Sequence, residues 1–241
     1  MHPMSEWWLK LKIYCTFTKQ EIVGIFASII IFGFMFSFKN WDTVSVGLGN
    51  WLLSGVILFF SLFIHEIAHK IAAISVGFKA TFKLSWTWIW GTLAACFVTN
   101  GFFIAPINGT IELKLAGRQR LGHFRYGLNY WAAGVVSFLG PLSNLIIAIM
   151  IKSFMILFPQ SIILEKALWI NVSLAIFNML PFPGIDGLQT FYGERMFYFS
   201  MLTIVIITGV SLMWLSALQS IVIGLLAATM VFGVIFYYEN K

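Results

Sequence analysis

Long apolar stretches separated by short polar turns dominate this 241-residue chain. The stretches long enough to cross about 30 Å of hydrocarbon occupy 22–38, 51–76, 130–151, 162–182 and 196–238. The last stretch is about twice the length of one span, so we expect two helices there, near 196–214 and 217–238. Thr18 and Glu21 form a capping-box pattern that predicts the start of the first helix. The pattern therefore predicts an all-α polytopic membrane protein with about six transmembrane helices.

The apolar stretch 86–104 does not fit a simple membrane span. It is rich in Trp and Thr, contains Asn100 and Gly101, and runs into the turn-forming residues Pro106–Gly109. Irregular backbone at membrane depth is tolerated where protein covers it or where it lines a cavity. We therefore expect a short re-entrant or β-like segment around 86–113.

The composition indicates a membrane protein independently of this pattern. Hydrophobic residues make up 60% of the chain and charged residues only 10%, whereas soluble domains carry about 25% charged residues. Aromatic residues reach 17%, which is typical of chains anchored at membrane interfaces. The formal net charge of +6 does not indicate nucleic-acid binding, because Lys and Arg in membrane proteins mostly mark the cytoplasmic side and the anionic lipid surface.

The distribution of Lys and Arg selects one topology. If six helices cross, the N-terminus is cytoplasmic and 86–104 does not cross, the cytoplasmic side carries eleven basic residues: Lys10, Lys12, Lys19, Lys79, Lys83, Lys114, Arg118, Arg120, Arg125, Arg195 and Lys241. The outer side then carries three: Lys39, Lys152 and Lys166. Because basic residues gather on the cytoplasmic side, we predict a multi-pass protein of the cell membrane with both termini cytoplasmic.

The chain shows no internal repeat and no polar segment long enough for a separate soluble domain. We predict a single integral membrane domain over 1–241, with a catalytic core at about 51–190 and a C-terminal helix pair at 191–241. The two cysteines, Cys15 and Cys96, form neither a disulfide framework nor a C-x-x-C metal pair.

An H-E-x-x-H motif at His65–His69 lies in the second half of a predicted apolar helix. Histidines four residues apart share one helix face. From there both imidazoles can reach one Zn²⁺ at about 2.0–2.1 Å, with Glu66 beside the water of the site. Ionisable groups at the bilayer centre cost about 2.5–3.5 kcal/mol on insertion scales and are usually functional. The alternative is a polar cluster that joins helices by hydrogen bonds.

Two histidines leave a catalytic zinc site one protein ligand short. Asp186 is the best-placed acidic residue, because it follows the run Asn178–Pro183, whose prolines cannot continue a regular helix. Gly184 and Gly187 permit a turn that brings its carboxylate inward. Glu194 is the competing ligand, although its polar surroundings predict that it faces water. Alone, a stretch rich in Pro, Gly and Asp, such as 183–187, is usually an ordinary turn at the end of a helix.

Taken in order, these motifs resemble the site-2 protease family of intramembrane zinc metalloproteases. Members combine H-E-x-x-H with a later proline-rich motif that begins with Asn and ends with Asp-Gly, matched here by Asn178, Pro181, Asp186 and Gly187. The chain departs from this motif at the second proline, Pro183. Gly140–Asn144 is similar to the G-P-x-x-N signature on the intervening helix. The likeness covers about 55–190 and suggests a minimal core form without PDZ or CBS domains.

The resemblance implies the activity and the roles of single residues. It implies peptide hydrolysis with one Zn²⁺ ion, held by His65, His69 and Asp186. Glu66 is then the base that takes a proton from water. Asn178 is the implied donor that stabilises the oxyanion, and Asn144 is a second candidate. Both Asn side chains could instead hydrogen-bond between helices.

The predicted substrate is a membrane-embedded segment of another protein. A helical substrate must unwind first, because its amides are held in backbone hydrogen bonds, and a pairing edge at 97–113 could then bind the extended chain. Two alternatives remain open: a membrane zinc protease whose site is completed by the distal Glu194, and a zinc-binding membrane regulator that does not cut. Glu66 favours the protease, since a structural zinc site does not need it.

Overall fold

The computed structural model describes residues 3–115, 129–239 and 241. The basic stretch predicted to face the cytoplasm is described only in part, because Arg118, Arg120 and Arg125 lie outside these residues. Helices are present at all six positions predicted for a membrane span. The run 196–238 is divided into two helices, as predicted.

Among the residues that the structure describes, four helices are long and apolar enough to cross a membrane: α2 (Lys19–Ser37), α3 (Val44–Ser75), α5 (Tyr130–Phe154) and α9 (Ala217–Glu239). Two others, α6 (Ile162–Asn178) and α8 (Arg195–Ser211), have 17 residues each. Helices of that length extend over about 25 Å, less than the roughly 30 Å of a typical hydrocarbon core. Length and composition therefore support four spans, and the number six stays a prediction. The shorter helices are α1 (Pro3–Tyr14), α4 (Trp86–Val98) and α7 (Asp186–Gly193).

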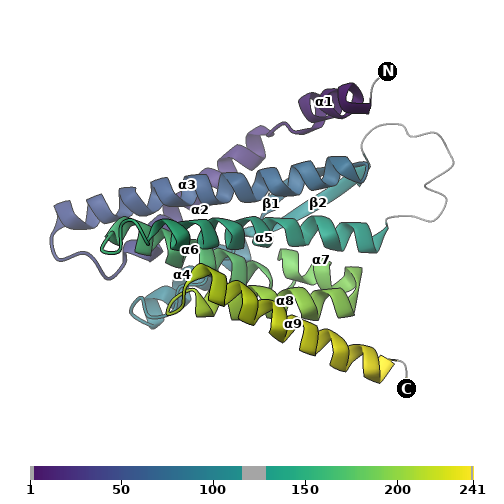
Figure 1. Ribbon diagram of the computed structural model, residues 1–241. Helices are drawn as coiled ribbons and strands as arrows, with labels where there is room; N and C mark the ends of the chain where they lie inside the picture. Colours follow the sequence, from purple (N-terminus) through teal and green to yellow (C-terminus); the bar gives the residue numbers. More distant parts are fainter. Residues whose placement is uncertain (1–2, 116–128, 240) are drawn as a thin grey trace.

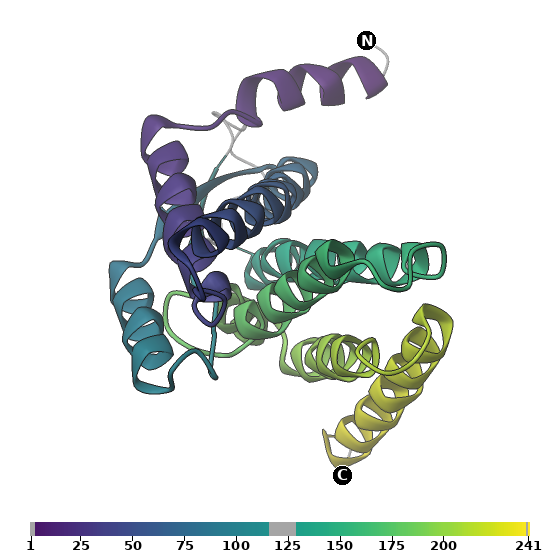
Figure 2. The same cartoon turned by 90° about the vertical axis from the view of Figure 1, so that its left-hand side faces the viewer.

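The central helix of the bundle is α3, which packs against both α2 and α5 (Figure 1). In turn, α5 contacts α6 and the short helix α7. Helices α8 and α9 form a hairpin at the far side of the bundle, beyond α5, α6 and α7 (Figure 2). Figure 1 also shows both termini at the same end of the bundle.

Two apolar cores lie on either side of the central helices. One joins α2, α3, α4 and α6 around fully buried side chains such as Phe32, Leu62 and Ile170. The other joins α5, α6 and α8, with Phe138 and Tyr198 among its buried members. Each core fixes part of α6, so the end of that helix has a defined position relative to α3.

The fold is not purely helical, which corrects the all-α prediction. Strand β1 (Phe78–Leu84) pairs with β2 (Gly109–Leu115) in a two-stranded antiparallel sheet. Phe78, Ala80 and Phe82 are buried, and the residues between them are partly exposed. This alternation has the period of two that marks a half-buried strand. It is present in the sequence, but the adjacent long apolar helices dominate the pattern there.

The segment expected to be re-entrant or β-like leaves the sheet and returns to it. Residues 86–98 form α4, so the β-like alternative is wrong for this part, whereas residues from Gly109 onward do form a strand. The re-entrant alternative stays a prediction. Leu84 and Gly109 are paired across the sheet, and Ser85 N donates to Asn108 O at 2.9 Å. The segment 85–108 therefore begins and ends at the same end of the sheet.

A buried ion pair ties α3 to α2 and β1. Glu21 and Lys70 are each 1% exposed, and Lys70 Nζ lies 2.6 Å from Glu21 Oε1. Glu21 also accepts hydrogen bonds from the backbone N–H groups of Thr18 and Phe82. Lys70 also donates to the carbonyls of Thr16 and Ala80. Because both charges are neutralised and hydrogen-bonded, the pair can remain buried.

We predict that Glu21→Gln destabilises the protein by about 3–5 kcal/mol, because it leaves the Lys70 charge buried without its partner. The measurement is thermal unfolding of purified protein in detergent. Glu112→Gln is the matched control: Glu112 pairs with Lys114 at 3.4 Å on the surface, where a pair contributes about 0–1 kcal/mol. Equal unfolding temperatures for the two variants would contradict the prediction.

Candidate metal centre

The histidines of the H-E-x-x-H motif lie on the face of α3 that meets α5. His65 and His69 are each 1% exposed, and their ring centroids lie 4.7 Å apart. Their Nε2 atoms are separated by 3.1 Å. Two imidazole nitrogens this close, out of contact with water, repel each other unless they share a proton or a cation.

The third donor is supplied by the break between α6 and α7. Pro181 and Pro183 follow the end of α6 and prevent it from continuing. Gly184 has a φ of +78°, a left-handed conformation that glycine adopts without strain. The chain turns there, and Asp186 becomes the first residue of α7.

The turn brings the Asp186 carboxylate to the histidine pair. Its Oδ2 atom lies 3.2 Å from His65 Nε2 and 3.1 Å from His69 Nε2. Asp186 is 2% exposed. The structure thus brings together all three residues predicted as metal ligands. His65 and His69 lie on one turn of α3, and Asp186 follows more than a hundred positions later in the sequence.

The donor set fits a zinc ion. Ligands held at about 2.0–2.1 Å in tetrahedral geometry lie roughly 3.3 Å apart, close to the three observed separations of 3.1, 3.1 and 3.2 Å. Two imidazoles and one carboxylate are ligand types that zinc uses. Three protein ligands, not four, are typical of a catalytic site, which keeps one position for water or substrate. Within the described residues, this is the group of His, Cys, Asp and Glu side chains able to hold a metal.

Two contacts fix the loop that carries Asp186. Trp88 Nε1, on α4, donates to Pro183 O at 2.6 Å. Gly187 lies inside α7, where a methyl group would overlap the main chain of residues 179–180. Gly187 therefore does not serve the predicted turn; its lack of a side chain allows the backbone of residues 179–180 to approach closely.

A hydrogen bond of His69 Nδ1 determines which ring nitrogen of His69 carries the proton. Nδ1 lies 2.8 Å from the carbonyl oxygen of Val136 on α5. A carbonyl only accepts, so Nδ1 carries the proton and Nε2 keeps its lone pair. This is the arrangement that a metal-binding histidine requires.

Asn144 lies beside Nδ1 of His65, as the Val136 carbonyl lies beside Nδ1 of His69. Its Nδ2 lies 3.0 Å from His65 Nδ1, while its buried Oδ1 has no partner in the described part of the chain. When Nε2 binds a metal, the ring proton sits on Nδ1 and needs an acceptor. Turning the Asn144 amide by half a rotation presents Oδ1 to that proton and satisfies both groups. Its position favours orienting His65 over the predicted role as an oxyanion donor.

Glu66 is buried beside the two histidines. It is 2% exposed, although a charged side chain is rarely buried without a partner. No hydrogen bond or ion pair to its carboxylate is found within the residues that the structure describes. Both carboxylate oxygens are therefore free to accept a proton.

The two remaining candidates have other partners. The Nδ2 group of Asn178 donates to Leu174 O, one turn earlier in α6, at 3.0 Å. Its role as oxyanion donor stays a prediction and requires the side chain to turn. Glu194 caps α8, where its carboxylate accepts from the N–H groups of Met196 and Phe197 at 3.1 and 2.7 Å. Asp186 is thus the acidic residue that contacts both histidines, and Glu194 caps the N-terminus of α8.

Three polar side chains that were not predicted as site residues, Thr110, Gln189 and Ser137, extend the centre toward the sheet. Thr110 Oγ1 donates to Asp186 Oδ1 at 3.4 Å. Gln189 Nε2 donates to Thr110 Oγ1 at 3.0 Å and to Ile111 O at 2.7 Å. The hydroxyl of Ser137 donates to Gln189 Oε1 at 2.8 Å. The only sequence signal for Gln189 was its position three residues after Asp186, on the same helix face.

The chain is similar to a protein of Methanocaldococcus jannaschii named "Putative zinc metalloprotease". The two are 26% identical over 178 residues, which cover 71% of this chain and 83% of the relative. No known family model matches the chain, and no solved structure matches it. The similarity supports a zinc metalloprotease and does not extend to the site-2 type.

Gly140 on α5 touches both histidines, and we predict that it cannot be enlarged. A methyl group there would overlap Nε2 of His65 and of His69. Gly140→Ala should therefore displace the rings and weaken Zn²⁺ binding by about 10–100-fold, as disturbed metal environments do. Competition with a chelator measures the affinity. Gly233→Ala, where a methyl group meets nothing within 4 Å, should bind zinc as the unchanged protein does.

The two acidic candidates can be separated by metal analysis. We expect Asp186→Asn to lose most of the bound zinc, because an amide is a much weaker ligand than a carboxylate. Glu194→Gln should keep about one Zn²⁺ per chain, since it alters only the cap of α8. The metal content is measured by elemental analysis after dialysis. The opposite result, with zinc lost in Glu194→Gln alone, would show that the distal glutamate is the ligand.

Proposed function

We propose that the protein is an intramembrane zinc metalloprotease of the site-2 type, which hydrolyses peptide bonds of membrane-embedded proteins. The observation that carries the proposal is the meeting of three zinc-type donor atoms beside Glu66, inside a bundle of apolar helices. The similarity to the archaeal relative supports the metalloprotease chemistry. The order of the three sequence motifs supports the site-2 type.

Zinc at this centre would be held by His65, His69 and Asp186. When bound, it supplies Lewis-acid polarisation of the substrate carbonyl and lowers the pKa of water. Glu66 takes a proton from the attacking water, whose oxygen adds to the carbonyl carbon. The C–N bond then breaks, and Glu66 returns the proton to the leaving amine. Asn144 and the Val136 carbonyl keep the imidazole rings in place during these steps.

We place the centre at membrane depth, with six crossings and both termini cytoplasmic. The common end of the two termini in the bundle supports an even number of crossings (Figure 1). The two ends of the segment 85–108 lie side by side, at the end of the sheet. This proximity supports a segment that enters and leaves on the same side of the membrane without crossing it. Buried ionisable side chains in apolar helices are usually functional. The site therefore lies where water is scarce and a substrate helix can approach from the lipid.

The substrate would bind along β2. Phe82 N is turned toward Glu21, so the backbone of Ile111, its partner in the sheet, faces the outer edge of β2. A cavity of about 750 Å³ runs along this edge and is lined by residues of β2, α5 and α7. The Ile111 carbonyl at this edge already accepts a hydrogen bond from Gln189 Nε2. An extended substrate pairs with β2 when Gln189 releases that carbonyl, next to Thr110 and the metal ligand Asp186.

Glu66→Gln is the decisive variant. The amide keeps the size of the side chain but cannot take a proton, so cleavage should fall by about 10²–10⁴-fold. Zinc content should remain at the level of the unchanged protein, because Glu66 is not one of the donors. The experiment uses full-length protein in detergent or vesicles and a panel of helical membrane substrates.

The comparison also separates the proposal from its alternative. Zinc retained together with lost cleavage supports the protease. Zinc bound by both proteins, with no cleavage by either across the panel, would favour a membrane regulator. Cleavage by Glu66→Gln at the unchanged rate would remove Glu66 from the mechanism.

A further inference from the structure

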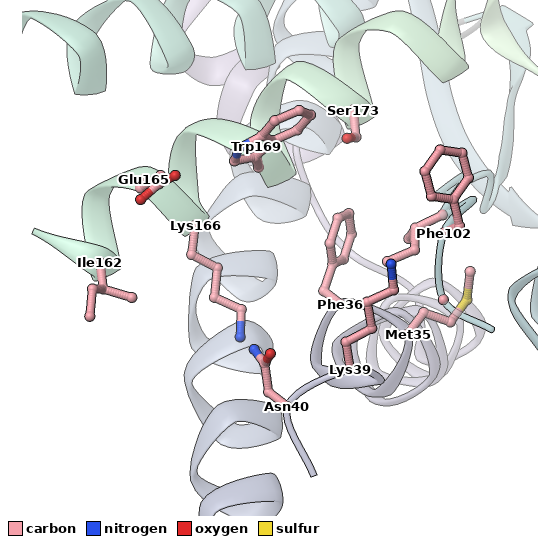
Figure 3. A pocket seen from close by; sticks show the side chains of 12 residues that line it. Met35, Phe36, Lys39, Asn40, Phe102, Ile162, Glu165, Lys166, Trp169 and Ser173 are labelled. Atoms are coloured by element: carbon pink, nitrogen blue, oxygen red, sulfur yellow. The ribbon is translucent and has the colours of Figure 1, made fainter. Parts of the chain in front are cut away.

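A second cavity, of about 550 Å³, lies at the other end of α6 from Asn178. It is formed by the end of α2, residues 162–173 of α6 and the segment 101–104 (Figure 3). Apolar side chains make up most of its wall, among them Met35, Phe36 and Trp169. Two lysines also line it, and neither belongs to the metal centre.

Lys166 is half-buried in this wall and has no acidic partner in the described part of the chain. Its Nζ donates to Asn50 O at 3.3 Å, which uses one of three N–H donors. No carboxylate lies within 4 Å of it among the described residues. Figure 3 shows the side chain extending from α6 toward the turn that carries Asn40. A partly desolvated ammonium group without a counterion favours an anionic ligand.

Lys39 provides a second cation on the same cavity. Its Nζ lies 5.5 Å from the ring centroid of Phe102, and within the described chain no carboxylate approaches it to 4 Å. Glu165 also lines the cavity but pairs with neither lysine. The lining therefore has a net charge of +1, from two Lys and one Glu.

The apolar part of the lining is open toward the surroundings of the bundle. Phe102 is 85% exposed and Trp169 is 52% exposed. Tryptophan beside lysine at the end of a membrane helix is typical of the lipid headgroup level. The cavity thus combines cations for a phosphate with aromatic surface for acyl chains.

We propose that this cavity binds the headgroup of an anionic phospholipid, with its phosphate between Lys39 and Lys166. The acyl chains lie against Phe36, Phe102 and Trp169. The ammonium groups satisfy the phosphate oxygens by charge-assisted hydrogen bonds, and the net positive lining selects an anionic lipid over a zwitterionic one. The lipid joins the ends of α2 and α6, and its binding does not depend on zinc or on cleavage.

The test is native mass spectrometry of the full-length protein with added phosphatidylglycerol, and with phosphatidylcholine of the same acyl chains as a zwitterionic comparison. We expect preferential retention of phosphatidylglycerol. The double variant Lys39→Ala/Lys166→Ala should bind it roughly 10–30-fold more weakly, from about 1 kcal/mol per lysine. Lys152→Ala is the matched control, because Lys152 lies in the last turn of α5 and does not line the cavity.

Several results would overturn the proposal. Equal phosphatidylglycerol binding by the double variant and the Lys152→Ala control would exclude the lysine pair. Equal retention of the two lipids by the unchanged protein would exclude anionic selectivity. Displacement of the lipid by inorganic phosphate at equal concentration would show a phosphate site, not a lipid site. If the alanine variant does not fold, Lys39→Arg/Lys166→Arg keeps both charges and must retain the lipid.

Discussion

The structure depends on bringing one carboxylate and two imidazoles within about 3 Å of one another, away from water. Such a cluster is costly inside apolar helices unless a shared cation or proton balances it. The rest of the fold supplies the geometry: helical spacing places His65 and His69 together, and the break after α6 delivers Asp186. Gly140 leaves the space that the two rings need.

The central helix α3 is held by buried polar groups on two faces. His69 contacts α5 and α7 through Val136 and Asp186. The next residue, Lys70, reaches α2 and β1 through Glu21 and backbone carbonyls. Adjacent helix positions point about 100° apart, so consecutive residues tie the same turn of α3 to different neighbours. A shift of α3 would disturb the metal centre and the ion pair together.

The small sheet links the metal centre to the cavity that runs along the outer edge of β2. Pairing of β1 with β2 places Thr110 against Asp186 and leaves one strand edge beside Gln189. The hydrogen bonds that support Asp186 thus continue through Thr110 and Gln189 to the carbonyl of Ile111 on β2. If substrate binds along β2 as proposed, a displacement of Gln189 would reach Asp186 through the hydrogen bonds Gln189–Thr110 and Thr110–Asp186.

The amino-acid sequence is enough to predict the membrane class, the helix positions and the ligand candidates, because apolar stretches and H-E-x-x-H spacing are local properties. It did not determine that β1 would form, since a strand exists only with its partner, β2, 25 or more residues away. Nor did it determine the roles of Asn144, Trp88 or Gln189, whose partners come from other elements. These features follow from the packing of the helices, because hydrogen bonds between distant segments form only when packing brings the segments together.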